Sequence, residues 1–305
     1  MIPVPHRRTV DLALLAVAVV WGSSYLAAKD SVEPDGVFAF LAIRFGIAAA
    51  GLALVLAPRL RGLTRTEVAC GSAFGSILAV VLTLETFGVT KTSAANAGLV
   101  ISLTMVITPL LDRRPGAAPL PAGFYGAATI AVVGVGLLTQ NGGFAAVSLG
   151  DLLILGAAVA RSVHVTVISR VCAARPVDPG RVTLVQLCTA LAAFVVLSSW
   201  TGRDVTQVAG QMTMRSWVLV VYLALACTVF AFAVQMWAAR HTSAARVGVL
   251  LGTEPLWAAA IGVLVAGDPV TLVGVIGAAL ILAGVNLARA VEGRTPHGVA
   301  ATTSP

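Results

Sequence analysis

Four charged residues stand within long apolar stretches of the sequence: Arg44, Glu85, Arg161 and Glu254. A charge at the centre of a lipid bilayer costs about 2.5–3.5 kcal/mol on insertion scales, so a charged side chain there needs a partner or a function. Two basic and two acidic residues can pair with each other, bind a charged solute or carry a coupling ion. These four residues are therefore the first candidates for the chemistry of the protein.

Arg161 and His164 are three residues apart, which places them on one face of the helix predicted for residues 151–170. Histidine titrates at about pH 6.5 and is suited to sensing protons. We hypothesise that Arg161 pairs with Glu254 or Glu85 across a central cavity, and that His164 tunes or senses protons there. The alternative is a structural ion pair that only holds helices together.

Arg44 lies in the apolar stretch 36–57, and a shift of the chain by 142 residues places it on Gln186. Both side chains can hydrogen-bond a substrate near the middle of the membrane. An equally weighted alternative role for Arg44 is to cap a helix end or to extend its charged head to the membrane surface. Glu85 lies only about one helical turn from the outer end of its stretch. A solvated mouth position and a coupling site are therefore both open for it.

Only two of the 14 prolines, Pro109 and Pro255, fall inside predicted spans. Each removes a backbone hydrogen bond and interrupts its helix, which makes these helices candidates for moving gates. A static kink is the alternative. Trp21, Tyr25 and Asn96 complete the expected wall of the site, with aromatic rings for organic surface and an amide for orientation.

Composition indicates that the membrane surrounds most of the chain. Of the 305 residues, 58% are hydrophobic and 11% are charged, with a mean hydropathy of +0.95, whereas about a quarter of the residues in a soluble domain are charged. A spanning helix needs about 20 apolar residues. The sequence predicts an all-α membrane protein with ten transmembrane helices, over residues 10–29, 36–57, 67–89, 93–111, 122–139, 151–170, 181–200, 216–238, 243–265 and 270–288.

The basic residues are unevenly distributed between the loops. With the N-terminus in the cytoplasm, 14 of the 20 Lys and Arg residues fall on the cytoplasmic side, four fall outside, and Arg44 and Arg161 remain within spans. This asymmetry follows the positive-inside rule, so both termini are expected in the cytoplasm. A basic complement of 18 Arg and two Lys is typical of a high-GC bacterial source, which predicts the cell inner membrane.

The chain contains an internal repeat. A shift of 150 residues brings Thr92–Gly98 onto Thr242–Gly248 with five identities in seven positions. The sequence therefore predicts two halves, 10–139 and 150–288, each with five helices, followed by a disordered cytoplasmic tail over 289–305. Because five is odd, the second half must enter the membrane with opposite polarity, as an inverted repeat. Transporters use such repeats for alternating access.

Four segments carry a resemblance to a known family: Trp21–Tyr25, Ala42–Phe45, Thr92–Gly98 and Thr253–Trp257. Together and in this order, they resemble the EamA-type branch of the drug/metabolite transporter (DMT) superfamily. The resemblance covers essentially the whole chain as two EamA repeats. It implies a ten-helix secondary transporter of the inner membrane, often an exporter (efflux) of amino acids, metabolites or toxic compounds.

Several function classes lack their motifs. The sequence has no phosphate-binding GxxxxGK[ST], no HExxH and no GxSxG, so ATP hydrolysis, metalloprotease and serine hydrolase chemistry have no support. We expect no enzyme, no cofactor, no metal and no nucleic acid. The expected partners are a small-molecule substrate and the lipid bilayer, with protons or a counter-substrate as candidates for coupling. The alternatives are an integral-membrane enzyme acting on a lipid-linked substrate, with Arg161, His164 and Glu254 as acid/base groups, and a receptor that binds without transport.

Overall fold

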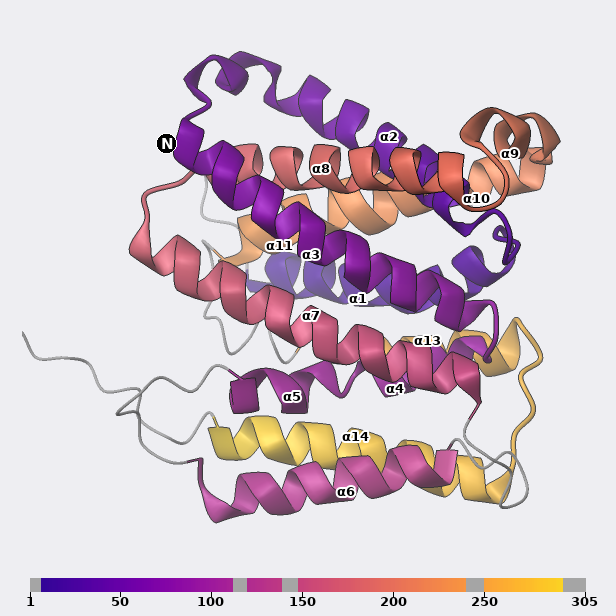
Figure 1. Ribbon diagram of the computed structural model, residues 1–305. Helices are drawn as coiled ribbons and strands as arrows, with labels where there is room; N and C mark the ends of the chain where they lie inside the picture. The colour runs from indigo at the N-terminus through magenta and orange to yellow at the C-terminus, as the bar shows by residue number, and fades with distance from the viewer. Residues whose placement is uncertain (1–6, 112–119, 139–147, 240–249, 293–305) are drawn as a thin grey trace, which may run out of the picture.

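The computed structural model describes residues 7–111, 120–138, 148–239 and 250–292, and all regular structure in these ranges is helical (Figure 1). The first half contains α1 (Arg7–Lys29), α2 (Val37–Leu56), the 3₁₀ helix η1 (Ala57–Gly62), α3 (Arg65–Val89), α4 (Ala94–Ile101), α5 (Thr104–Leu111) and α6 (Ala122–Leu138). The second half contains α7 (Leu149–Ala174), α8 (Pro179–Trp200), α9 (Val205–Gln211), α10 (Met214–Ala224), the π-helical turn η2 (Leu225–Phe230), α11 (Ala231–Ala239), α13 (Glu254–Leu264) and α14 (Leu272–Glu292).

Seven helical segments are long and apolar enough to cross a membrane; one of them joins α4 to α5, and another joins α10 and η2 to the start of α11. Three shorter apolar helices, α6, α13 and α14, stand where the sequence predicts the fifth, ninth and tenth spans. The prediction of an all-α membrane protein is confirmed. The described residues do not establish ten spans, because residues 240–249 of the predicted ninth span lie outside them.

Two further predictions concern the C-terminal tail and the second copy of the repeat segment. The helix α14 continues to Glu292, so residues 289–292 of the predicted tail are helical, and the rest of the tail lies outside the described residues. The repeat segment Thr242–Gly248 lies outside them as well.

Short polar side chains determine where several helices begin. Ser93, Ser148 and Asp178 each accept a hydrogen bond from the backbone N–H three residues later, at 3.0, 3.0 and 3.1 Å. Thr64 and Glu67 form a reciprocal capping box at the start of α3. These bonds satisfy N–H groups that the first helical turn leaves free.

Contacts at one end of the bundle show the relative directions of the helices. At the end of α1, Lys29 Nζ donates to the Thr92 carbonyl at 2.9 Å, and Thr92 Oγ1 donates to Asp151 Oδ1, at the start of α7, at 2.6 Å. We call this end the Lys29 face. The helix α1 therefore ends where α7 begins, so the first helices of the two halves run in opposite directions.

The opposite end, which we call the Arg181 face, joins the starts of α3 and α8. Arg181 Nη2 and Nε donate to Glu67 Oε1 at 2.7 and 3.1 Å, and the Asp178 backbone N–H donates to the same oxygen at 2.8 Å. This ion pair fastens a helix of the first half to a helix of the second.

Glycines allow helices of the two halves to approach closely. A β-carbon at Gly71 or Gly75 of α3 would lie 2.6 Å from atoms of Val185 or of Gln186 and Thr189 in α8. The Gly71–Gly75 spacing is the small-residue pattern of close helix packing in membranes. Gly134 of α6 meets α14 in the same way, and these two helices lie side by side at one edge of the bundle (Figure 1).

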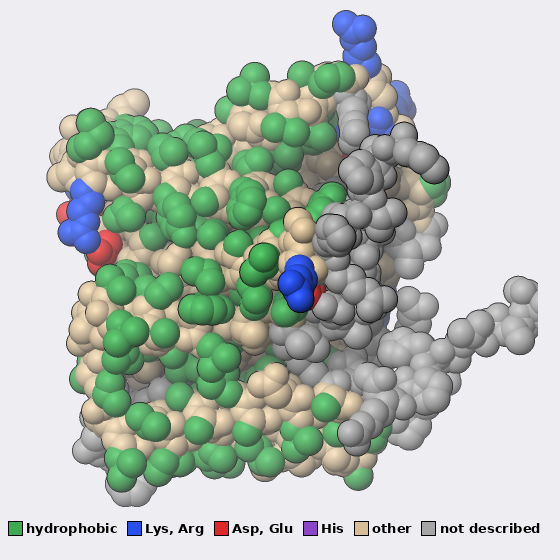
Figure 2. Space-filling view, turned by 180° about the vertical axis from the view of Figure 1, so that it is seen from behind, with side chains coloured by type: hydrophobic (Ala, Val, Ile, Leu, Met, Phe, Trp, Pro, Cys, Tyr) green, Lys and Arg blue, Asp and Glu red, His purple; other side chains and the backbone are tan. Residues whose placement is uncertain are grey.

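The outer surface is apolar. Leu264 is 82% exposed, and Leu54 and Trp200 are each 79% exposed, whereas a soluble protein rarely leaves extended apolar surface in water. Figure 2 shows one face on which hydrophobic side chains predominate and few charged side chains are seen. Lipid satisfies such a surface, so the chain is a multi-pass membrane protein.

Candidate functional site

The predicted charged residues meet in the interior of the bundle. Arg161 of α7 forms an ion pair with Glu85 of α3 through its Nη2, and Tyr25 of α1 donates its hydroxyl proton to Glu254 Oε1 of α13 at 2.8 Å. Arg161 also interacts electrostatically with Glu254 and lies near Tyr25. The sequence left Glu85 and Glu254 open as partners of Arg161, and the structure gives the direct contact to Glu85.

Arg44 of α2 belongs to the same group, because it interacts electrostatically with Glu85 and Arg161 and lies near Tyr25. We call Tyr25, Arg44, Glu85, Arg161 and Glu254 the central charge cluster. It draws one residue from each of five helices, three in the first half and two in the second. The cluster holds two cationic and two acidic side chains, so it can bind charged groups of either sign.

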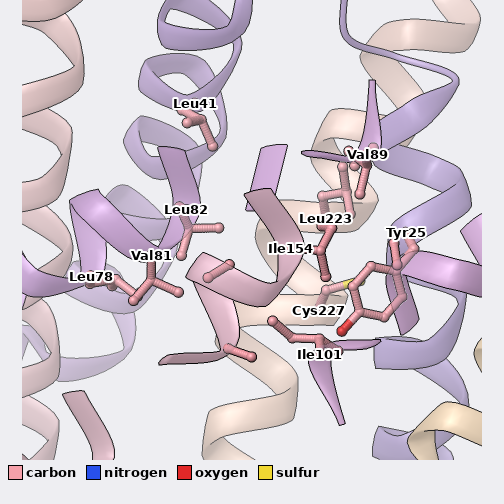
Figure 3. Packing of buried hydrophobic residues seen from close by; sticks show 14 of the residues in the cluster. Tyr25, Leu41, Leu78, Val81, Leu82, Val89, Ile101, Ile154, Leu223 and Cys227 are labelled. Carbon is pink, nitrogen blue, oxygen red and sulfur yellow. The ribbon is translucent and has the colours of Figure 1, made fainter. Parts of the chain in front are cut away.

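The two bonded pairs of the cluster differ in burial. Tyr25 is 2% and Glu254 9% exposed, whereas the side chain of Arg161 is 31% and that of Glu85 12% exposed. Figure 3 shows Tyr25 within the main cluster of buried hydrophobic residues, together with Ile101, Leu223 and Cys227. The Tyr25–Glu254 bond is therefore enclosed by apolar side chains.

His164 and Gln186 lie to one side of the cluster, where α7 and α8 meet α3. His164 is 8% exposed and interacts with Gln186 and with the Phe74 backbone. Its Nε2 is buried and has no hydrogen-bond partner among the described residues. Arg161 is the member of the cluster that acts on His164 electrostatically.

Trp21 contacts a feature that sequence reasoning missed. Its Nε1 donates to the Cys227 carbonyl at 2.8 Å, inside the π-helical turn η2. A π turn is rare and is found mostly at functional sites. The Thr228 hydroxyl donates to the carbonyl of Leu223, five residues earlier, at 3.0 Å. Nothing in the residue types of this segment could have indicated the turn.

Both helices that contain an internal proline are interrupted, at positions 150 residues apart. The first is interrupted at Ser102–Leu103, between α4 and α5, and the second at Gly252–Thr253, immediately before α13. The hydroxyls of Ser102 and Thr253 each donate to a carbonyl three residues earlier, at 2.6 and 2.8 Å. Polar side chains thus satisfy backbone groups at both interruptions.

The two prolines relate differently to these interruptions. Pro255 occupies the first turn of α13, where its missing N–H costs little. Pro109 lies inside α5, and the interruption comes earlier in the chain than the proline itself. The interruption expected at Pro255 lies directly before that proline. The interruption expected at Pro109 lies farther from its proline, at Ser102–Leu103.

The helices α4 and α13 pack tightly against each other near the Lys29 face. A β-carbon at Gly98 would collide with the β-carbon of Ala258, and one at Gly262 would lie 2.7 Å from the Ala95 nitrogen. The Ala95 N–H donates to Asp268 Oδ2 at 2.9 Å. Asn96 lies in the same first turn of α4 and is 6% exposed. It does not belong to the central charge cluster.

A cavity of about 290 Å³ lies toward the other end of the bundle, between α2, α8 and the segment η2–α11. Its walls are mainly apolar, and its residues at the Arg181 face include Asp178 and Gly180. Leu52, Leu187, Thr228 and Phe232 are among the residues that line it.

The described residues contain no group of three His, Cys, Asp or Glu side chains that could hold a metal ion.

Comparisons with known proteins agree with this arrangement. The model of the EamA-like transporter family matches the chain twice, over residues 8–140 and 148–289. An uncharacterized transporter of Archaeoglobus fulgidus is 27% identical over 276 residues, which cover 90% of this chain and 84% of that protein. A crystal structure of a protein 20% identical in sequence has a TM-score of 0.63 and covers 92% of this chain and 98% of that one, a likeness that shows the fold alone. These matches point to a membrane transporter rather than an enzyme, and the chain belongs to the EamA-like transporter family.

Proposed function

We propose that this protein is a secondary transporter that exports a small metabolite or drug across the inner membrane by alternating access. The central charge cluster carries the proposal, because it gathers five polar side chains from both halves in the interior of an apolar bundle. Ten transmembrane helices in two inverted repeats, residues 10–139 and 150–288, form the proposed architecture. The opposite directions of α1 and α7 support it.

The positive-inside rule puts the Arg181 face in the cytoplasm and the Lys29 face outside. In this orientation the contact between α4 and α13 closes the outer side, and the cavity lies toward the cytoplasm. The interrupted helices with Pro109 and Pro255 are the proposed gates, since freed backbone groups tolerate bending.

Residues of the cluster, together with Trp21, form the proposed substrate and coupling site. Asn96 is proposed to line the outer route, His164 to sense protons beside Arg161, and Gln186 to act as a hydrogen-bonding side chain next to His164. No nucleotide-binding motif is present in the sequence, so a proton gradient or a counter-substrate is the proposed source of energy.

The test is expression of the chain in a transport-deficient bacterium, with comparison of extracellular metabolites and of resistance to amino acids, antibiotics and dyes. We expect a changed profile that Arg161→Ala abolishes. Arg215→Gln is the matched control, because Arg215 pairs with Asp30 at the exposed rim. A profile that the wild-type protein leaves unchanged, with the protein present in the membrane, would contradict transport.

A further inference from the structure

Arg44 is the one cation of the central charge cluster that lacks a bonded partner within the described chain. Arg161 is paired with Glu85, and Glu254 is bonded to Tyr25. The guanidinium of Arg44 forms no hydrogen bond or ion pair with any described residue, and its Nε is buried without a partner. A guanidinium carries five N–H donors, and the four on the two Nη atoms of Arg44 are not fully buried, so water or a ligand can reach them.

Such a group is energetically unfavourable inside a membrane protein. An arginine keeps its charge in proteins, and a charged group in the protein interior is destabilising when it has no partner. Phe45 and Ile43, its neighbours on α2, are buried and apolar, and Arg161 adds electrostatic repulsion. Water or a bound anion must therefore satisfy Arg44, and a planar guanidinium fits the two oxygens of a carboxylate.

The cavity lies on the same side of α2 as Arg44. Val55 follows Arg44 by eleven residues, which is about three helical turns and the same helix face, and both Val55 and Leu52 line the cavity. The turn η2 connects the two sites from the opposite wall. Cys227 lies near Arg44, and the next residue, Thr228, lines the cavity.

We propose that Arg44 binds the carboxylate of a transported organic anion whose apolar body occupies the cavity of α2, α8 and η2–α11. This inference rests on the proposed transport function and adds the chemical class of the substrate. Leu52, Leu187 and Phe232 supply the apolar wall for the body. The Arg161–Glu85 pair stays intact when such an anion binds, because Arg44 supplies the positive charge.

The test uses three probes with one ring and different charge: benzoate, benzamide and benzylamine. Binding to the purified full-length protein in lipid nanodiscs is measured by calorimetry at constant ionic strength. We expect benzoate to bind at least tenfold more tightly than the other two. Arg44→Gln should remove this preference, Arg44→Lys should retain part of it, and Arg215→Gln should leave it unchanged.

Two results would overturn the inference. Equal binding of the three probes would mean that the site does not select an anion. Displacement of benzoate by an equal concentration of chloride would mean a site for inorganic anions only. Because binding is measured directly on each folded variant, a loss of transport through misfolding cannot imitate the expected result.

Transport measurements separate this inference from the proposed function. If the wild-type protein exports solutes and all of them are neutral or cationic, transport stands and the carboxylate site is wrong. If benzoate binding depends on Arg44 but no solute crosses the membrane, the site stands and transport is wrong.

Discussion

The helix α3 carries two glutamates that each pair with an arginine of the second half, and their surroundings differ. Glu67, 1% exposed, accepts hydrogen bonds from the backbone and side chain of Thr64, from the Asp178 N–H and from two nitrogens of Arg181. Glu85 accepts one, from Arg161, within the described chain. The first carboxylate is saturated, while the second keeps accepting capacity that a solute or a proton can use.

This difference separates a structural ion pair from one suited to function. A saturated buried pair loses all its bonds if it opens, so it resists movement. A pair with one bond and a partly exposed arginine can exchange partners at small cost. We therefore expect substitutions at the two glutamates to act on different properties, stability for Glu67 and transport for Glu85.

The largest loss of stability should follow Glu67→Ala. Removing one partner of a buried ion pair costs about 3–5 kcal/mol, and the Asp178 and Thr64 N–H groups lose their acceptor as well. Denaturant titration in detergent measures this loss, with Glu67→Gln as a variant that keeps the shape and loses the charge. A loss no larger than about 1 kcal/mol, as for a surface pair, would remove the distinction between the two glutamates.

Gly75→Ala should give the next largest effect and locate the rigid part of α3. The new β-carbon would lie 2.6 Å from the Gln186 carbonyl oxygen and from Thr189 Cβ, and overpacking of this kind costs about 1–3 kcal/mol. The same titration measures it. Gly126→Ala is the matched control, because a β-carbon there has no neighbour within 4 Å. Equal stability of the two variants would mean that α3 and α8 separate easily.

Glu85→Gln should lower stability by less than Glu67→Ala, because Glu85 accepts one hydrogen bond within the described chain and the side chain of its partner Arg161 is 31% exposed. Transport should fall at least tenfold, since the amide neither neutralises Arg161 nor carries a proton. Solute flux into proteoliposomes reports the second effect and denaturant titration the first. Unchanged flux together with a loss of stability like that of Glu67→Ala would mean that both glutamates are structural.

The smallest effect should come from a third ion pair, at the exposed rim of the Lys29 face. Arg203 binds Glu33 and Asp35, and its hydrogen bond holds the pKa of Asp35 below the ordinary value. A carboxyl group with a lowered pKa stabilises the fold above its unfolded pKa of about 3.9 and loses this contribution as the pH falls through the folded pKa.

Arg203→Gln should therefore lower the unfolding temperature slightly at pH 7 and make no difference at acid pH, where Asp35 is protonated. In about 1 M salt, where the screening length is about 3 Å, the difference at pH 7 should also vanish. Thermal unfolding at two pH values and two salt concentrations measures this. A difference that persists at low pH or high salt would show that Arg203 stabilises the rim by packing rather than by charge.

Much of the fold could be predicted from the sequence, because apolar runs and polar caps are local signals. The four charged residues of the central charge cluster could also be predicted, since charges within apolar runs stand out. Their pairing could not be predicted, because Glu85 and Glu254 lie on different helices and only their packing determines which one contacts Arg161. The Thr64–Glu67 capping pattern is visible in the sequence, but its bond to Arg181 across the two halves is not.

The glycine contacts have a consequence for the bodies that move in a transport cycle. Gly22 brings α1 against α13, Gly75 brings α3 against α8, and Gly134 brings α6 against α14, and every one of these pairs takes one helix from each half. A swing of one sequence half against the other would pull all three pairs apart. A rigid body that keeps these contacts during the cycle must combine helices from both repeats. The bodies that move relative to each other are therefore not the two sequence repeats.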